Sequence, residues 1–242
     1  MTPVMNPPLR ACYVVGVDPL AHSNWSRSAT VAGFKTSPPN AVLMDFMAQE
    51  RRSRKIQRIL DIGCGAARNA APLAAAGFQV LGTDLSWPML QAARSRKEPS
   101  PGRLDLALSP MDISPARDQA FDAVVAHGIW NLARSGVEFR QAVREAARVS
   151  RPGASLFVFT FSRHTLPEDA LPVAGETFVF TQFSGQPQCF LTEAELLAEL
   201  QAVGYERDSL EPLTEYNRPR PGELPAMRGP VIYEGTFRRS SH

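Results

Sequence analysis

The 242-residue chain has few cysteines, no long hydrophobic run and little excess of either charge. Its three cysteines, Cys12, Cys64 and Cys189, are far apart and odd in number, which favours free thiols in a reducing compartment over a disulfide framework. No apolar run reaches the roughly 18 residues of a membrane span, and the N-terminus lacks the pattern of a signal peptide. We therefore expect a cytoplasmic protein without a membrane partner.

The charge balance also excludes several kinds of partner. The chain has 26 basic and 24 acidic residues, a formal net charge of +2, which is too small to attract nucleic acid. The basic run at residues 51–55 is better explained as a solvated helix end than as a patch for RNA or lipid. The four histidines show no metal-ligand spacing. We expect a small-molecule partner and no metal, and the sequence leaves the oligomeric state open.

Residues 59–85 are the stretch around which the rest of the chain is organised. An apolar strand leads into Asp61, and Gly63 and Gly65 then provide a turn that a ligand can approach closely. An alanine-rich helix follows, and a second β pattern ends at Asp84. This order predicts one right-handed βαβ unit with a nucleotide-like cofactor at its turn.

Two carboxylates indicate which cofactor this is. Asp84 lies 84 − 65 = 19 residues after Gly65, close to the roughly 20-residue spacing at which a dinucleotide fold places an acid on the ribose. The negative carboxylate of Asp61 would face the negative phosphates of NAD, which is unfavourable, whereas it would attract an ammonium or sulfonium group. Arg68 also replaces the third glycine of G-x-G-x-x-G. A phosphate-free, cationic adenosine cofactor is favoured, and an NAD-dependent oxidoreductase is the alternative.

These residues resemble the class I S-adenosylmethionine-dependent methyltransferases. The first motif of that family, D/E-x-G-x-G-x-G, reads here Asp61-Ile62-Gly63-Cys64-Gly65-Ala66-Ala67, with Ala67 in place of the last glycine. The resemblance continues through residues 111–113, 121–127 and 151–153, and it covers roughly residues 57–238.

The resemblance implies S-adenosylmethionine as cofactor and S-adenosylhomocysteine as its product. It implies that Asp61, Gly63 and Gly65 line the methionine part, and that Asp84 binds the ribose hydroxyls. Asp112 would accept from the adenine amino group, although it could instead cap a turn. The other residues expected at the cofactor are Arg68, Leu85, Met89, Ile113 and His127.

The acceptor side is predicted from residues near the strand ends. His127 ends the fourth strand, where an imidazole could act as a general base or only shape the wall. Trp130 could stack on a flat substrate or pack in the core, and Arg163 could neutralise an acidic substrate or stand in solvent. Trp25 and Phe34 come from the N-terminal extension and could complete the acceptor pocket.

Alternating strands and helices predict an α/β fold, with a doubly wound, mainly parallel sheet and helices on both faces. The family resemblance adds seven strands and an antiparallel last strand. Residues 1–36 would form an extension, either an active-site lid or a surface segment, before a methyltransferase domain at residues 37–242. Within that domain, residues 162–191 would be a substrate-side insertion, and a capping box at Thr192 and Glu195 would open the next helix.

We therefore expect in-line transfer of a methyl group to a heteroatom (O, N or S) of a small molecule. The sulfonium is already activated, so the protein mainly needs to hold the reactants in near-attack geometry. Residues 126–130 do not match the [D/N/S]-P-P-[F/Y/W] motif of enzymes that methylate nucleic-acid amino groups. A non-catalytic cofactor-binding protein of the same fold is the remaining alternative.

Overall fold

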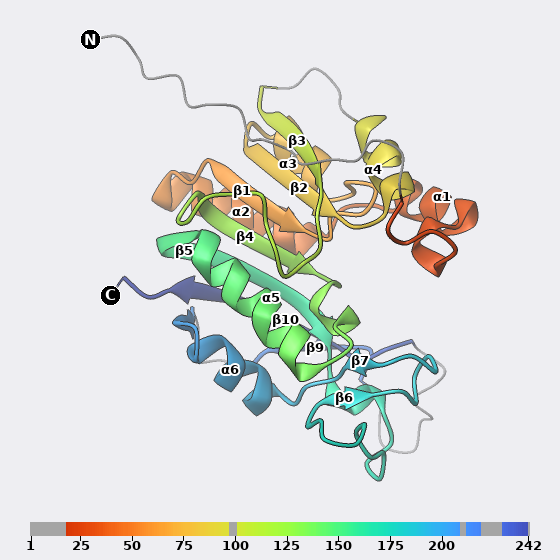
Figure 1. Cartoon of the computed structure of the whole chain (residues 1–242). Coiled ribbons are helices and arrows are strands. Elements are labelled where there is room, and N and C mark those ends of the chain that lie inside the picture. Colours follow the sequence, from red (N-terminus) through yellow and green to blue (C-terminus); the bar gives the residue numbers. More distant parts are fainter. Residues whose placement is uncertain (1–17, 97–100, 209–211, 219–228, 242) are drawn as a thin grey trace.

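The computed structural model describes residues 18–96, 101–208, 212–218 and 229–241. Its centre is an eight-stranded sheet in the order β3-β2-β1-β4-β5-β10-β8, with β9 also paired to β10 (Figure 1). The strands are β1 (Arg58–Ile62), β2 (Gln79–Asp84), β3 (Arg103–Leu108), β4 (Phe121–His127), β5 (Ser150–Phe161), β8 (Tyr205–Arg207), β9 (Thr214–Tyr216) and β10 (Ile232–Arg239). A separate two-stranded sheet consists of β6 (Val179–Phe180) and β7 (Gln188–Cys189).

Strand direction divides the sheet into two parts. The pairs β1 with β2, β1 with β4, β2 with β3, and β4 with β5 are parallel, whereas β10 runs antiparallel to its neighbours. The predicted α/β class, with a mainly parallel sheet and an antiparallel last strand, is confirmed. The sheet has one strand more than the seven predicted, because β9 is only three residues long and too short to show an alternating pattern.

Helices cover both faces of the sheet. On one face lie α2 (Ala41–Arg54), α3 (Ala70–Ala75) and α4 (Trp87–Arg94), and on the other lie α5 (Gly136–Val149) and α6 (Glu193–Gln201) (Figure 1). Side chains alternate along a strand, so Val124 and Ala126 of β4 pack toward α5 and α6, while Ala123 and Val125 pack toward α2. Each face therefore has its own apolar core.

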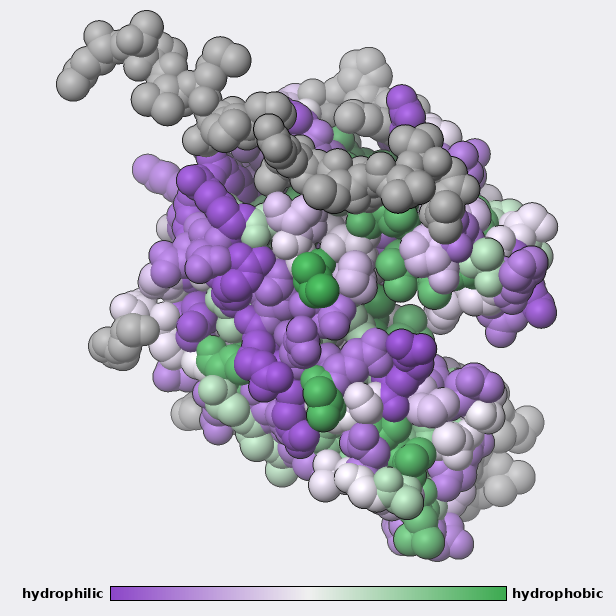
Figure 2. All heavy atoms as spheres, in the orientation of Figure 1, coloured by the Kyte–Doolittle hydropathy of each residue, from purple (hydrophilic) through white to green (hydrophobic). Residues whose placement is uncertain are grey.

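Helix α5 shows how this division is encoded. Phe139, Val143 and Ala146 of α5 are buried, whereas Gln141 and Arg144 are exposed. This spacing gives a helix with one apolar stripe facing the sheet. The opposite side forms part of the hydrophilic band across the middle of the molecule in Figure 2.

Polar contacts hold both ends of α2. Asn40 caps its N-terminus by accepting from the backbone N–H of Leu43 at 2.9 Å. Glu50, near its C-terminal end, is buried and pairs with Arg238 of β10, with 2.6 Å between Oε2 and Nη1. Ser155 of β5 also donates its hydroxyl to Glu50. The helix is therefore fixed in position along the sheet.

The predicted N-terminal extension is described from residue 18 onward, and residues 1–17 lie outside the described residues. Its helices η1 (Asn24–Ser26) and α1 (Ser28–Thr36) pack beside α4 (Figure 1). The Ser86 hydroxyl donates to the carbonyl of Trp25 at 3.2 Å, and the Trp87 N–H donates to Asp18 Oδ1 at 3.1 Å. This segment is thus attached next to the end of β2.

The sequence prediction of a capping box before α6 is confirmed. The capping box is present, since the Thr192 side chain accepts from the backbone of Glu195 while the Glu195 carboxylate accepts from Thr192. Among the described helices, none is long and apolar enough to cross a membrane. In the same described part of the chain, no group of three His, Cys, Asp or Glu side chains could hold a metal ion.

Candidate functional site

The turn after β1 brings three left-handed residues close together. Gly63, Gly65 and Ala67 have φ values of 67°, 53° and 59°. A Cβ at Gly63 would lie 2.6 Å from Cδ1 of Ile129, so only glycine fits there. Ala67 takes the same conformation although it carries a side chain, and it is fully buried. The turn predicted from the glycines therefore forms, with an alanine in a strained position.

Asp84 closes this turn against the end of β2. Its carboxylate accepts from the backbone N–H of Gly65 at 2.8 Å and from that of Ser86 at 2.8 Å. Burial raises the pKa of Asp84, although these backbone donors act in the opposite direction. Met89 is buried at the start of α4, with its sulfur 3.9 Å from where a Gly65 Cβ would be. Asp84, Met89 and the glycine turn are therefore neighbours.

Asp61 is a buried carboxylate below the turn. It is only 2% exposed, and its Oδ2 has no hydrogen-bond partner among the described residues. Burial raises the pKa of Asp61 to about 7, the charge of Asp84 adds to this rise, and the Arg68 cation opposes it. A buried anionic oxygen without a partner is costly, so this site favours a ligand that brings a cation.

His127 ends β4 and lies beside the turn. Its ring stacks on Phe159 at a centroid distance of 4.1 Å, and Arg68 Nη2 lies 3.3 Å from Nδ1 and 3.2 Å from Nε2. Burial and the Arg68 cation lower the pKa of His127 to about 4. The imidazole is therefore neutral at physiological pH and is a weak base in the cofactor-free protein, which favours the wall role over the predicted general base.

Asn40 connects the site to the antiparallel strand β10. Its Nδ2 donates to Glu234 Oε2 at 2.8 Å and lies 3.2 Å from His127 Nε2. Its backbone N–H donates to Asn69 Oδ1 at 3.0 Å. The sequence analysis did not single out this residue, although an asparagine before α2 is itself an N-cap signal.

Glu234 and Tyr216 extend the same network. Glu234 is 5% exposed, and the Tyr216 hydroxyl donates to its Oε1 at 2.7 Å. The hydrogen bond to this carboxylate raises the pKa of Tyr216 to about 12. Tyr216 also faces Phe159 at 6.4 Å between ring centroids. No local signal could have identified these two residues, because their partners lie on other strands.

Two residues considered for the acceptor side make other contacts, and for Trp130 the structure shows the core-packing alternative. Trp130, in the short helix η2 (Trp130–Leu132), has no exposed surface and packs edge-on against Phe139 in the core. Arg163, in η3 (Arg163–Thr165), donates to the carbonyls of the following loop, including that of Pro167 at 2.9 Å. It also lies 4.8 Å from the ring centroid of Phe180. Trp130 is a core residue, and Arg163 holds the insertion together.

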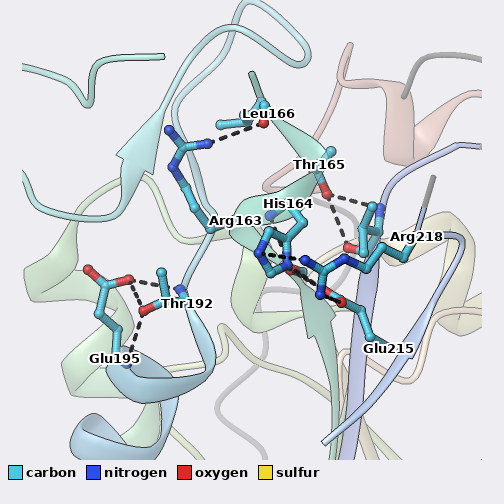
Figure 3. Close-up of polar contacts among 10 residues, drawn as sticks. Arg163, His164, Thr165, Leu166, Thr192, Glu195, Glu215 and Arg218 are labelled. Atoms are coloured by element: carbon cyan, nitrogen blue, oxygen red, sulfur yellow. Dashed lines mark hydrogen bonds and ion pairs between the residues drawn. The ribbon is translucent and has the colours of Figure 1, made fainter. Parts of the chain in front are cut away.

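Figure 3 shows the orientation of Arg163 directly. Its guanidinium extends toward Leu166, away from a second cluster formed by His164, Glu215 and Arg218. In that cluster, His164 Nδ1 and Glu215 Oε1 are 2.6 Å apart, and Arg218 pairs with the other carboxylate oxygen at 2.7 Å. The charge of Arg163 is therefore directed at loop carbonyls rather than at an acidic substrate.

Asp112 and Ile113 follow the end of β3, where the adenine was expected. Ile113 is 59% exposed, which is unusual for a large apolar side chain and leaves its surface open to a ligand. The backbone N–H of Ser114 donates to Glu145 Oε1 at 2.6 Å, so Asp112 does not cap a turn through that group. Leu85 lies between Asp84 and the Ser86 cap of α4 and is partly buried.

The two predicted aromatic residues of the extension lie together. The rings of Trp25 and Phe34 meet edge-on at 6.0 Å. Phe34 also lies on the glycine turn, since its Cδ1 is 3.4 Å from the place where a Gly65 Cβ would be. The extension therefore contacts the predicted cofactor loop.

Comparison with known proteins agrees with this geometry. A family described as "Methyltransferase domain" matches residues 60–158. A S-adenosylmethionine-dependent methyltransferase of Methanosarcina mazei has a TM-score of 0.62, with 18% identity, 85% of this chain covered and 100% of the other. The 1,6-didemethyltoxoflavin-N1-methyltransferase of Burkholderia thailandensis, crystallised with bound 1,6-didemethyltoxoflavin and S-adenosylhomocysteine, has a TM-score of 0.57, with 17% identity. The match covers 83% of this chain and 79% of that chain. These two likenesses show the fold.

Sequence identity carries the relationship further. The chain is 30% identical over 193 residues to the demethylmenaquinone methyltransferase of Corynebacterium urealyticum, which covers 70% of this chain and 79% of that protein. The chain spans about half the length of other curated relatives that it matches. A relationship of this extent assigns the family, and the chain belongs to the class I methyltransferases that depend on S-adenosylmethionine.

Proposed function

We propose that this protein transfers the methyl group of S-adenosylmethionine to a heteroatom of a small-molecule acceptor. The observation that carries this proposal is the partnerless oxygen of Asp61, buried below a turn in which a side chain at Gly63 would clash with Ile129. A buried anion there suits the ammonium group of a methionine moiety and disfavours the phosphates of NAD. The NAD-linked alternative therefore receives no support from the site.

The remaining residues fit the other parts of the cofactor. Arg68 would pair with the methionine carboxylate, Asp84 would accept from the ribose hydroxyls, and Asp112 and Ile113 would hold the adenine. None of the ion pairs among the described residues includes Arg68, so its guanidinium is available for such a contact. When bound, the cofactor supplies a methyl group on a sulfonium, which already leaves readily.

The chain's own task is then to bind and orient the acceptor. His127, Phe159 and Tyr216 form an aromatic wall at the ends of β4, β5 and β9. Nucleophilic heteroatoms carry a lone pair, so holding that lone pair in line with the methyl group supplies most of what the transfer needs. The names of the relatives do not decide between carbon and heteroatom acceptors, and the toxoflavin enzyme is a nitrogen methyltransferase by name.

We also propose that residues 18–36 act as a lid. The contact of Phe34 with the glycine turn supports this role, because a segment on that turn would exclude water from the reacting atoms. No residue of α1 is fully buried, so the segment contributes little to the core. The insertion at residues 162–191 is the proposed second wall of the acceptor site, and a cytoplasmic location remains a prediction.

Calorimetric titration with S-adenosylhomocysteine and with NADH tests the cofactor. We expect binding of the first only, and binding of NADH alone would refute the proposal. Incubation with methyl-labelled S-adenosylmethionine and a metabolite extract then tests catalysis, with mass spectrometry of the labelled product to identify the methylated atom. Binding without any transfer would favour a non-catalytic member of the family, and a new carbon–methyl bond would refute the heteroatom acceptor.

A further inference from the structure

The contact between Arg68 and His127 is not an ordinary hydrogen bond. Nη2 of Arg68 is 3.3 Å from Nδ1 and 3.2 Å from Nε2 of the same ring. The two ring nitrogens point in diverging directions, so an atom equidistant from both is aligned with neither. Arg68 therefore acts on His127 mainly as a nearby positive charge, and that charge opposes a second positive charge on the imidazole.

The other polar neighbours of His127 act differently. Asn40 Nδ2 lies 3.2 Å from Nε2, and its orientation is fixed because its Oδ1 caps α2 while Nδ2 also donates to Glu234. Nε2 thus faces a donor, which assigns the ring proton to Nδ1. The buried Glu234 carboxylate lies just beyond Asn40, and a negative charge there favours a protonated imidazole. Arg68 is the opposing cation in direct contact.

Arg68 has a second electrostatic partner in Asp61. The two side chains attract each other across the glycine turn, since the charge of Asp61 raises the pKa of Arg68 while burial lowers it. An acid and a base side by side match the two charges of an amino-acid zwitterion, with the ammonium at Asp61 and the carboxylate at Arg68. A ligand of this kind would bring a carboxylate to Arg68, which forms no ion pair among the described residues.

We propose that the carboxylate of the bound cofactor neutralises Arg68 and so releases His127 to hold a proton, which couples cofactor binding to the acceptor side of the site. This inference rests on the proposed function. Arg68 is in this view a positioning residue between two ligands. After the cofactor has bound, His127 takes a second proton at Nε2 in place of the hydrogen bond from Asn40 Nδ2. The polar groups around the ring are Arg68, Asn40, Glu234 and, through Arg68, Asp61. Burial of the ring also lowers the pKa of His127, and cofactor binding does not remove that effect.

NMR titration of the His127 ring signals tests the coupling in the full chain. The titration is run on the free protein, on the complex with S-adenosylhomocysteine, and on the complex with methylthioadenosine, which lacks the amino-acid part. His127→Gln assigns the signals. We expect the midpoint of His127 to rise by about one pH unit or more with S-adenosylhomocysteine and to stay near its free value with methylthioadenosine.

An Arg68→Met variant provides the matched control. Its His127 midpoint should already be raised without ligand and should not rise further with S-adenosylhomocysteine. If this variant does not fold, Arg68→Lys, whose charge is a compact ammonium, should retain the ligand response. Binding of S-adenosylhomocysteine without a change at His127 would overturn the inference and leave the proposed function standing. Failure of S-adenosylhomocysteine to bind would overturn both.

Discussion

Asn40 and Glu234 are 194 residues apart in the sequence and are joined by a hydrogen bond of 2.8 Å. The same two elements meet again where Glu50 of α2 pairs with Arg238 of β10 at 2.6 Å. Helix α2, whose N-cap Asn40 contacts His127, is thus attached at both ends to β10, the strand between β5 and β8. The geometry of the acceptor wall therefore depends on β10 as well as on the cofactor loop.

The strain at Ala67 predicts a stabilising substitution. A residue other than glycine in the left-handed region destabilises the fold by about 1–2 kcal/mol. Glycine avoids this strain, but part of the gain is offset because glycine has more conformational freedom in the unfolded chain. Ala67→Gly should raise the free energy of unfolding by about 1 kcal/mol, measured by urea denaturation. Ala66→Gly is the matched control, since Ala66 is equally buried but does not have a positive φ, and it should destabilise. A less stable Ala67→Gly protein would contradict the strain argument.

The raised pKa of Asp61 predicts a pH-dependent cost to stability. The pKa of Asp61 rises from 3.8 to about 7 on folding. Its contribution to the free energy of unfolding is therefore fully present below pH 3.8, where the carboxyl is protonated, and is lost as pH rises through about 7. Asp61→Asn should remove this cost and be more stable than the parent protein above about pH 8, by on the order of 2–4 kcal/mol. Thermal denaturation of the ligand-free proteins at several pH values checks this, and parallel curves would contradict it.

The same carboxylate predicts the pH dependence of cofactor binding. Asp61 must lose its proton before it can pair with an ammonium group, so affinity for S-adenosylhomocysteine should fall as pH drops below 7, by up to about tenfold per pH unit. Calorimetric titrations of the parent protein and of Asp61→Asn provide the comparison. The variant should bind more weakly at neutral pH and should show a flatter profile, and an unchanged slope would remove Asp61 from the site.

Removal of the N-terminal segment separates a lid from a packing role. Deletion of residues 1–34 should leave a folded protein that still binds S-adenosylhomocysteine but has lost most methyl transfer, because water then reaches the site. Since α1 has no fully buried residue, the melting temperature should fall only slightly, at roughly 2–4 °C per kcal/mol. A fully active truncation would defeat the lid, and a large thermal loss with normal activity would indicate packing.

Two substitutions at Asn40 separate its cap from its side-chain donors. Asn40→Ser keeps an oxygen for the Leu43 N–H, whereas Asn40→Ala loses the cap, which is worth about 1 kcal/mol. Asn40→Ser should therefore be the more stable variant, but both should alter the His127 NMR signals, since both lose the contact with Nε2. Equal stability, or an unchanged His127 spectrum in both variants, would show that the network does not work as described.

Predictions based on short-range spacing were the successful ones. The βαβ unit and the positions of Asp61 and Asp84 follow from residues fewer than thirty apart, and the capping box at Thr192 is wholly local. The roles of Asn40 and Glu234 were missed because their contact depends on how β10 is inserted next to β5. Local pattern gives the order of elements, whereas the partner of a side chain depends on the tertiary arrangement.

Single aromatic and cationic residues were the least predictable. Trp130 follows a strand end in the sequence, yet η2 turns it inward against Phe139. Arg163 was expected either to neutralise an acidic substrate or to stand in solvent, but its guanidinium contacts the carbonyls of the following loop and the ring of Phe180. Residue type suggests what such a side chain can bind, but the direction in which it points is decided by packing.

The place of β10 has a consequence for biosynthesis. The ribosome makes β5 well before β10, although the two strands pair from Ser155 to Phe161 in the finished sheet. Until β10 arrives, the nascent chain presents an unpaired strand edge along Leu156, Phe157 and Val158, all of which are fully buried in the folded protein. A pause in translation within the long connection before β10 would prolong that exposure. Chaperones that bind apolar extended segments would then bind to this strand edge.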